Sequence, residues 1–272
     1  MPVDKQKLAA LLEKTQKKYG RGALYLLGSK YEIAQIERIS TGLGDLDEIT
    51  GGGLPVGRIL EMYGPEGAGK TSMAYHFCGR VSLSIYVNME GTFDPTRAKQ
   101  FVNGRKMLIR RPDWGEQAWE IMLDAADAGV PLIVLDSVPA MIPRGEFERN
   151  KKDTEDAAKM AVVAKQMSEK LPILATYAEK SGSTVLLVNQ VRDNIGVMWG
   201  DPLTTPGGRA IRHYASIRMQ IARKQWIRKT IKGKGKTVGM VARLKIVKSK
   251  VCTPQGEAEL TLDFVRGWIN NG

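Results

Sequence analysis

The stretch RILEMYGPEGAGKT, residues 58–71, decides the fold that we predict for this chain. Its second half, residues 64–71, has the spacing G-x-x-x-x-G-K-[ST], and its first half is a strand-like apolar run. Glycines allow successive backbone N–H groups to curve around phosphate oxygens, and the N-terminus of a following helix adds partial positive charge. The stretch therefore predicts a strand, a phosphate-binding loop and a helix that begins near Lys70.

The same loop indicates a nucleotide site that holds a magnesium ion. Lys70 can reach the β- and γ-phosphates of ATP, and Thr71 can ligate Mg²⁺. Asp136 ends the apolar run LIVLD, where a protein with such a loop needs an acid for the metal. Glu90 ends the run IYVNME and can activate water, although a solvated strand-end glutamate is the alternative. The other loop positions expected around the phosphates are Gly64, Pro65, Glu66, Gly67, Ala68, Gly69 and Ser72.

Outward from this loop, short apolar or β-branched runs alternate with helical sequence. The runs cover residues 82–90, 131–138 and 183–190, and the helical stretches include 115–128 and 156–179. Continuous apolar strands alternating with helices predict an α/β fold, with a mostly parallel sheet flanked by helices. After residue 210 the segments lengthen, and we expect them to form antiparallel strands that extend the same sheet.

The N-terminus has the pattern of a separate element. Residues 4–19 form an amphipathic helical pattern that Asp4 can cap, and a strand-like run follows at residues 22–28. Since a lone helix and strand cannot bury an apolar face, they must pack on the main domain or on a neighbouring subunit. We therefore expect a segment for self-assembly at residues 1–35 and an ATPase core at residues 36–272.

Charge and composition limit the partners. The chain has 41 Lys and Arg against 29 Asp and Glu, a net charge of +12, which favours nucleic acid first, nucleotides second and anionic membranes third. No apolar run approaches the roughly 18 residues of a membrane span, and the N-terminus lacks a signal peptide. We expect a cytoplasmic protein in which Cys78 and Cys252, whose spacing fits no metal motif, are reduced and buried.

Residues 191–209, VRDNIGVMWGDPLTTPGGR, combine glycine and proline with large apolar side chains. The glycines and prolines exclude a regular helix or strand. A loop that exposes such apolar groups indicates a binding partner, and the alternative is a loop folded onto its own core.

Several long segments, taken together, resemble the RecA family of DNA strand-exchange ATPases, in the family's order. The resemblance implies a RecA-like core that forms filaments on single-stranded DNA, pairs it with homologous double-stranded DNA and exchanges strands, with DNA-stimulated ATP hydrolysis, in DNA recombination and repair. The segments are STGLGDLDEITGGGLPVGRILEMYGPEGAGKT (40–71), NMEGTFDP (88–95), VLDSVPAMIPRGE (134–146), NQVRDNIGVMWGDPLTTPGGRAIRHYAS (189–216) and RLKIVKSK (243–250).

The resemblance also implies roles around the nucleotide. Gln190 would sense the γ-phosphate and couple it to the loop that follows. Lys248 and Lys250 would reach across the subunit interface to the phosphates, so hydrolysis would need assembly. His213 stands where the family has an interface aromatic, and it could tune assembly with pH or be a plain interface histidine. The residues expected at the base are Asp94, Phe264 and Arg97, the last in place of an aromatic.

The resemblance places DNA contacts on two loops. In the second loop, near 191–209, arginines and glycine N–H groups would meet phosphates and apolar side chains would wedge between bases, without sequence readout. The first loop, near 143–156, carries a charge run that could instead be merely solvated. The residues concerned are Arg192, Ile195, Met198, Trp199, Gly207, Gly208 and Arg209 in the second loop, and Arg144, Arg149 and Lys159 in or beside the first.

We expect a basic segment to take the place of one feature of bacterial family members. Bacterial members usually continue past Gly272 into a small domain that collects duplex DNA, and a compact core without it resembles phage-encoded or shortened members. Residues 223–236 hold seven Lys and Arg and no acid, so we expect a hairpin that binds duplex DNA, with Arg223, Arg243 and Lys245 contributing. The alternative is a disordered basic tip without a role.

Two other functions share parts of these patterns. A hexameric motor, such as a replicative helicase or a clock-type ATPase, would have the same core. The N-terminal helix and strand, the glycine-paired loop and the lysines at 248 and 250 favour the recombinase. A mediator that binds nucleotide but hydrolyses little is disfavoured by Glu90, Asp136 and Gln190.

Overall fold

The computed structural model describes residues 4–19, 24, 36–148, 156–193, 203–231 and 233–270. Contacts divide the chain into two units, Met1–Glu37 and Arg38–Gly272. In the first unit, helix α1 (Lys5–Tyr19) is capped by Asp4, whose Oδ1 accepts the backbone N–H of Gln6 at 2.9 Å. No residue of α1 is buried. Apart from Leu24, the strand predicted at residues 22–28 lies outside the described residues.

In the described part of the second unit, a nine-stranded sheet has the order β13-β12-β11-β10-β3-β7-β6-β4-β5. Five neighbouring strands are mutually parallel, as predicted, and are β3 (Ile59–Gly64), β7 (Thr184–Gln190), β6 (Leu132–Asp136), β4 (Leu83–Asn88) and β5 (Lys106–Arg110). The other four are β10 (Ile217–Ile231), β11 (Lys234–Ser249), β12 (Glu257–Asp263) and β13 (Gly267–Asn270).

The C-terminal strands differ from the expectation at one place. Strand β10 pairs in parallel with β3, with Ile217 opposite Leu60, and only β11, β12 and β13 continue in antiparallel pairing. The return of the chain through helix α8 (Gly208–Tyr214) makes this parallel junction possible, because parallel neighbours need a crossover connection. The start of β10 therefore lies beside the strand that leads into the phosphate-binding loop.

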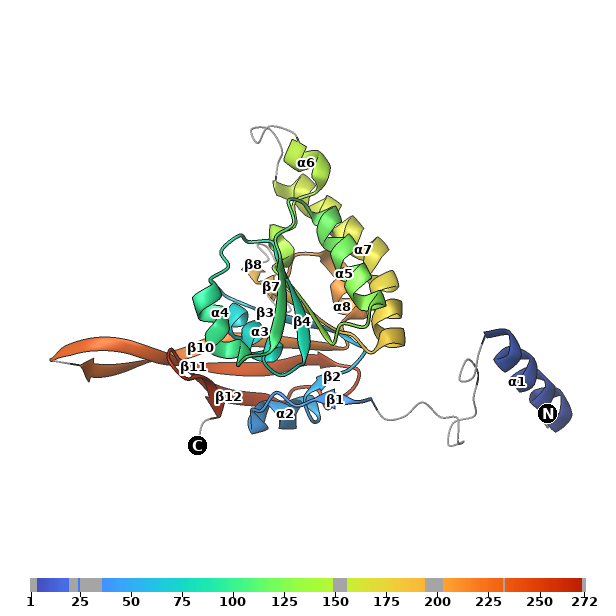
Figure 1. Ribbon diagram of the computed structural model, residues 1–272, viewed down its shortest axis with the longest axis horizontal. Coiled ribbons are helices and arrows are strands. Elements are labelled where there is room, and N and C mark those ends of the chain that lie inside the picture. Colours follow the sequence, from blue (N-terminus) through green and yellow to red (C-terminus); the bar gives the residue numbers. More distant parts are fainter. Residues whose placement is uncertain are drawn as a thin grey trace. The chain divides into compact units, whose positions relative to one another are not determined.

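Helices cover both faces of the sheet (Figure 1). Alternate residues of β7 show why, since Leu186 packs in the core cluster with α3 (Lys70–Cys78) and Leu187 in the cluster with α5 (Gly115–Asp127) and α7 (Asp156–Ser181). The helices α3, α5 and α7 occur where the sequence predicts them. The remaining elements are β1 (Arg38–Ile39), α2 (Gly44–Thr50), β2 (Leu54–Pro55), α4 (Pro95–Val102), η1 (Val138–Ala140), α6 (Arg144–Glu148), β8 (Arg192–Asp193) and β9 (Leu203–Thr204).

The hairpin of β10 and β11 extends well beyond the rest of the sheet (Figure 1). Near its tip, Lys229 lies directly opposite Lys236, a like-charge pairing that destabilises a free hairpin. The expected hairpin at residues 223–236 is therefore present, with an exposed basic tip. None of the described helices has the length and apolar character needed to cross a membrane.

The two cysteines are both free, but only one is fully buried. Cys78 lies in α3 inside the core, and burial raises the pKa of its thiol to about 12. Cys252, in the turn after β11, is half-buried. The expectation that both would be buried is wrong for Cys252, because it lies in the connection between β11 and β12, and connections run over the protein surface.

Candidate active site

A pocket of about 400 Å³ lies where the parallel strands end. Its walls come from the loop before α3, from the carboxyl ends of β4, β6 and β7, and from β10, β11 and β12. Ligands of open α/β sheets bind at such carboxyl ends. The lining residues are Glu66, Gly67, Gly69, Lys70, Thr71, Ser72, Glu90, Arg97, Asp136, Gln190, Trp226, Met240, Leu262 and Phe264.

Two glycines of the phosphate-binding loop allow β10 and β11 to approach it closely. A Cβ on Gly64 would lie 2.0 Å from the Ile221 carbonyl oxygen of β10. Gly69 has φ +94°, and a Cβ there would lie 2.6 Å from Met240 Cε of β11. Lys70 then begins α3, and its Nζ donates to the carbonyl oxygens of Gly64 and Pro65, both at 2.8 Å. Burial lowers the pKa of Lys70, while the acids around it oppose this shift.

Thr71 and Asp136 meet as the magnesium prediction requires. Thr71 Oγ1 donates to Asp136 Oδ2 at 2.8 Å, and the hydroxyl of Tyr86, on β4, donates to the same oxygen. Burial raises the pKa of Asp136, partly offset by these two hydrogen bonds. A hydroxyl and a carboxylate are the hard oxygen donors that Mg²⁺ prefers, and a cation would stabilise the charged form of this buried acid. The residues present fit the metal.

Glu90 lies between two polar side chains from the ends of neighbouring strands. Its Oε1 accepts hydrogen bonds from Ser137 Oγ at 2.5 Å and from Gln190 Nε2 at 3.2 Å. The structure thus brings together Glu90 and Gln190, which are 100 positions apart in the sequence. Ser137 and Tyr86 were not predicted at the site. Ser137 could have been predicted, because it directly follows Asp136 in the sequence. Nothing in the sequence distinguishes Tyr86 from any other residue of a buried strand.

A mixed aromatic and aliphatic wall forms the opposite part of the pocket. Arg97 Nη1 donates to the Phe264 carbonyl oxygen at 2.8 Å, and its guanidinium lies 5.7 Å from the Phe264 ring centroid. Asp94 caps α4 through the N–H groups of Thr96 and Arg97, and its side chain does not line the pocket. Trp226, Met240 and Leu262 complete this wall and were not predicted, because their strands reach the pocket only through the sheet order.

The two lysines predicted at the subunit interface lie against the C-terminus of α8. Lys248 Nζ donates to the carbonyl oxygens of Arg212, His213 (3.2 Å) and Ala215 (3.1 Å), and Lys250 Nζ donates to that of His213 at 2.6 Å. Cations at a helix C-terminus satisfy its free carbonyl groups. Burial, with Lys250 and Arg218 nearby, lowers the pKa of Lys248.

Comparison with known proteins decides the family. The family model for the RecA N-terminal domain matches residues 6–269. Protein RecA of Clostridium perfringens (strain 13 / Type A) is 38% identical over 280 residues, covering 99% of this chain and 77% of that protein. Protein RecA of Trichodesmium erythraeum (strain IMS101) is 37% identical over 276 residues, covering 99% and 74%. The chain belongs to the RecA family.

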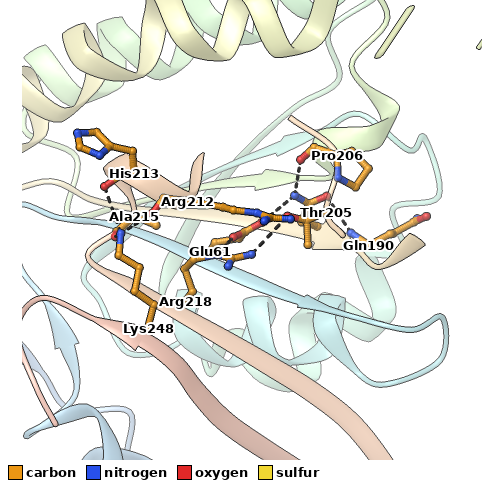
Figure 2. Close-up of polar contacts among 10 residues, drawn as sticks. Glu61, Gln190, Thr205, Pro206, Arg212, His213, Ala215, Arg218 and Lys248 are labelled. Atoms are coloured by element: carbon orange, nitrogen blue, oxygen red, sulfur yellow. Dashed lines mark hydrogen bonds and ion pairs between the residues drawn. The ribbon is translucent and has the colours of Figure 1, made fainter. Parts of the chain in front are cut away.

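A buried polar cluster in this RecA-family core ties the second loop to the strand before the phosphate-binding loop (Figure 2). Arg218 Nε donates to Glu61 Oε2 at 2.5 Å, and the two side chains are only 11% and 0% exposed. Asn189 Nδ2 donates to Glu61 Oε1 at 2.8 Å and to the Pro206 carbonyl oxygen at 2.9 Å. Arg218 Nη2 also donates to Thr205 Oγ1 at 3.4 Å. Both ends of the loop therefore contact one buried ion pair.

The structure describes only some of the residues predicted to contact DNA in the two loops. Gly207 and Gly208 have φ +93° and +72°, Gly208 starts α8, and Arg209 is exposed beside them. Arg192 lies in β8, opposite Thr204, and its side chain is not described. The positions Ile195, Met198 and Trp199 lie outside the described residues, as does Arg149 in the first loop.

The described part of the first loop includes a short helix. Helix α6 (Arg144–Glu148) occupies part of it, and Arg144 Nε donates to Glu148 Oε1 at 2.7 Å with its guanidinium 5.3 Å from the Trp114 ring centroid. Lys159 lies in α7, and its side chain is not described. The charge of Arg144 is thus partly neutralised before any DNA is bound.

The basic residues assigned to duplex binding fall into two groups. Arg243 and Lys245 pair with Glu257 at 3.8 and 3.0 Å, and Arg223 Nη1 donates to the Gly67 carbonyl oxygen at 3.4 Å, beside the nucleotide pocket. By contrast, Lys229, Lys234 and Lys236 at the hairpin tip form no ion pair with any other described residue. Among these assigned basic residues, those at the tip of the hairpin therefore form an exposed cationic surface.

Proposed function

We propose that this RecA-family protein is an ATP-dependent recombinase that forms filaments on single-stranded DNA, pairs it with homologous duplex and promotes strand exchange. One observation carries the proposal: Gln190, whose side chain contacts Glu90, directly follows Asn189, which holds the far end of the DNA-binding loop. A change at the γ-phosphate that moved Gln190 would therefore act on the residue next to Asn189, which contacts the other end of the loop at Pro206. Nucleotide state and DNA binding are coupled through this junction.

The residues of the pocket support ATP hydrolysis with Mg²⁺. Lys70, which contacts loop carbonyl groups, would donate to the β- and γ-phosphates instead. Bound through Thr71 and Asp136, Mg²⁺ would neutralise charge on the phosphates. Glu90 would orient a water molecule and accept its proton, held in place by Ser137 and Gln190.

Assembly would complete this site. We assign Lys248 and Lys250 to the phosphates of a neighbouring protomer, where cations stabilise developing negative charge. In the isolated protomer they hydrogen-bond α8, which follows the DNA-binding loop. Helix α1, which has no buried residue and belongs to the N-terminal segment at residues 1–35, would dock on the next protomer's core. Hydrolysis by a single protomer would then be slow.

Single-stranded DNA would bind the loop near 191–209 together with the first loop, and duplex DNA the tip of the β10–β11 hairpin. Three exposed lysines at the tip repel one another: Lys229, Lys234 and Lys236. The phosphate groups of a DNA backbone would relieve that repulsion. Backbone and stacking contacts without base-edge readout make the binding largely independent of sequence.

Electron microscopy of the protein with single-stranded DNA and a non-hydrolysable ATP analogue tests the proposal. Helical filaments together with DNA-stimulated ATP hydrolysis are expected. Glu90→Gln should keep the filaments but lose hydrolysis, because it removes only the proton acceptor. Ring-shaped particles with directional unwinding would instead identify a hexameric motor, and full hydrolysis by isolated protomers would contradict the coupling.

A second experiment separates the duplex surface from the single-strand surface. Replacing Lys229, Lys234 and Lys236 by glutamine should reduce strand exchange and its salt dependence, and should spare single-strand-stimulated hydrolysis. A matched triple replacement of Lys106, Lys165 and Lys180, on β5 and α7, removes the same charge elsewhere. If both triple variants exchange strands as the wild type does, the hairpin is not the duplex site.

A further inference from the structure

The exposed aromatic side chain on the β10–β11 hairpin lies at the nucleotide pocket rather than at its DNA-binding tip. Trp226 is 44% exposed, an unusual position for a tryptophan, and yet it lines the pocket. Its ring lies edge-on to Phe264, with centroids 6.3 Å apart and an interplanar angle of 71°. A large apolar ring held open to a ligand pocket is the arrangement that stacks planar ligands.

The backbone explains why Trp226 faces the pocket beside Arg223. Two residues three apart on a regular strand point to opposite faces. The pairing register shifts between Arg223 and Gln225, so that one extra residue is inserted there. This bulge allows Arg223 and Trp226 to share a face, with the guanidinium 4.2 Å from the indole ring centroid. Arg223 also contacts Gly67, so the pair is fixed to the phosphate-binding loop.

The rest of this wall complements a flat ring. Trp226 lies directly opposite Met240 on β11, and Met240, Leu262 and Phe264 continue the apolar surface. Among the described side chains of this wall, Arg97 carries the charge. Its Nη1 already donates to the Phe264 carbonyl oxygen and to Gln100 Oε1.

We propose that Trp226 stacks on the base of the bound nucleoside triphosphate and makes the pocket prefer purines over pyrimidines. The inference rests on the proposed nucleotide binding and adds a residue that no part of the RecA resemblance assigns. Stacking on an aromatic ring scales with the overlapping area, and a purine offers the larger area. Arg223 holds one side of the indole against the loop, which fixes the ring's orientation before the nucleotide arrives.

Equilibrium binding of a non-hydrolysable ATP analogue with Mg²⁺ to the whole protein, without DNA, tests the proposal. Trp226→Ala should weaken binding roughly 5- to 100-fold, the range of one base–aromatic stack, and Trp226→Phe should restore most of it. The ratio of binding constants for purine and pyrimidine triphosphates should fall toward unity in Trp226→Ala alone. Unchanged affinity and unchanged ratio in that variant would overturn the proposal.

Intrinsic fluorescence gives an independent readout, because a stacked base quenches an indole. The analogue should quench the tryptophan fluorescence of the wild type and not that of Trp226→Phe. The control variant Trp114→Phe should keep the quenching, because the Trp114 ring packs on Phe147. Equal quenching in wild type and Trp226→Phe would contradict the stack. Failure of the wild type to bind any triphosphate would instead defeat the proposed function itself, so the two failures are distinguishable.

Discussion

The two halves of the sheet each contain an ion pair between a basic side chain and a glutamate, one buried and one exposed. In the parallel half, Glu61 and Arg218 form an ion pair with side chains only 0% and 11% exposed. In the antiparallel half, Lys224 and Glu259 pair at 2.6 Å with side chains 55% and 41% exposed. Strand β10 carries both Arg218 and Lys224, so one strand passes from buried to exposed charge. Buried charges hold the chemistry in place, and exposed charges remain available to a polyanion.

The largest expected effect compares a residue of the phosphate-binding loop, in the parallel half, with an exposed charge of the antiparallel half. Lys70→Ala removes the charge that we propose contacts the phosphates, and it should lower DNA-stimulated ATP hydrolysis by on the order of 100-fold or more. Lys224→Ala removes an exposed charge and should change the rate less than about twofold. Steady-state phosphate release at saturating single-stranded DNA measures both, and similar losses would erase the distinction between the halves.

The second prediction compares the two ion pairs directly. Glu61→Ala leaves Arg218 buried without its partner and should cost about 3–5 kcal/mol in the free energy of unfolding. Glu259→Ala breaks an exposed pair and should cost less than about 1 kcal/mol. Chemical denaturation of the two variants against wild type gives both values. A small loss for Glu61→Ala would mean that the buried pair does not hold the loop.

The third prediction concerns pH and α3, in the parallel half. His76 Nε2 donates to the Thr41 carbonyl oxygen at 2.8 Å. Burial lowers the pKa of His76, Arg80 lowers it further, and the Thr41 bond and Asp47 oppose the shift.

Because the pKa of His76 is lower in the folded state, the unfolded chain takes the proton first as the pH falls. The stability from neutral His76 is present above pH 6.5 and is lost as the pH falls through the folded pKa. The loss is at most about 1.4 kcal/mol per pH unit. Unfolding free energies between about pH 7 and 5 should fall less steeply for His76→Gln, and an identical slope would contradict this role.

The smallest expected effect separates the two cysteines. Cys78 is fully buried with its pKa raised to about 12, whereas Cys252 is half-buried and its Sγ donates to Ser249 Oγ at 2.9 Å. In the native protein, iodoacetamide should modify Cys252 at least about tenfold faster than Cys78, because the thiolate is the reactive form. Peptide mass spectrometry gives both rates, and Cys252→Ser controls for the assignment.

Much of the site could be predicted because its residues carry strong local signals. Gly64, Gly69 and Lys70 have a fixed spacing, and Asp136 and Glu90 each end an apolar run. Parallel strands bring such ends to one edge, so placing these residues together needed only the fold class. The roles given to them stay predictions until the variants are measured.

The rest depended on which strands are neighbours. Trp226 and Met240 lie on the two strands of one hairpin, and they reach the pocket because β10 pairs with β3. Arg223 was assigned to duplex DNA from a charge run, and that assignment stays a prediction; its hydrogen bond to Gly67 could not be predicted, because it depends on strand pairing. A shift in strand register, and the face on which a side chain then lies, depend on pairing between strands. A local sequence pattern does not contain this information.

The amino-acid sequence by itself determined the phosphate-binding loop, the α/β class and the RecA family, because each depends on residues close together in the chain. Only the tertiary structure decided that Glu61, Asn189 and Arg218 form one buried cluster, and that Trp226 stands at the nucleotide pocket. The physical reason is the difference in range. Spacing and periodicity act over a few residues, whereas Glu61 is buried against partners more than 100 positions away and the Trp226 ring lies against Phe264, just after β12.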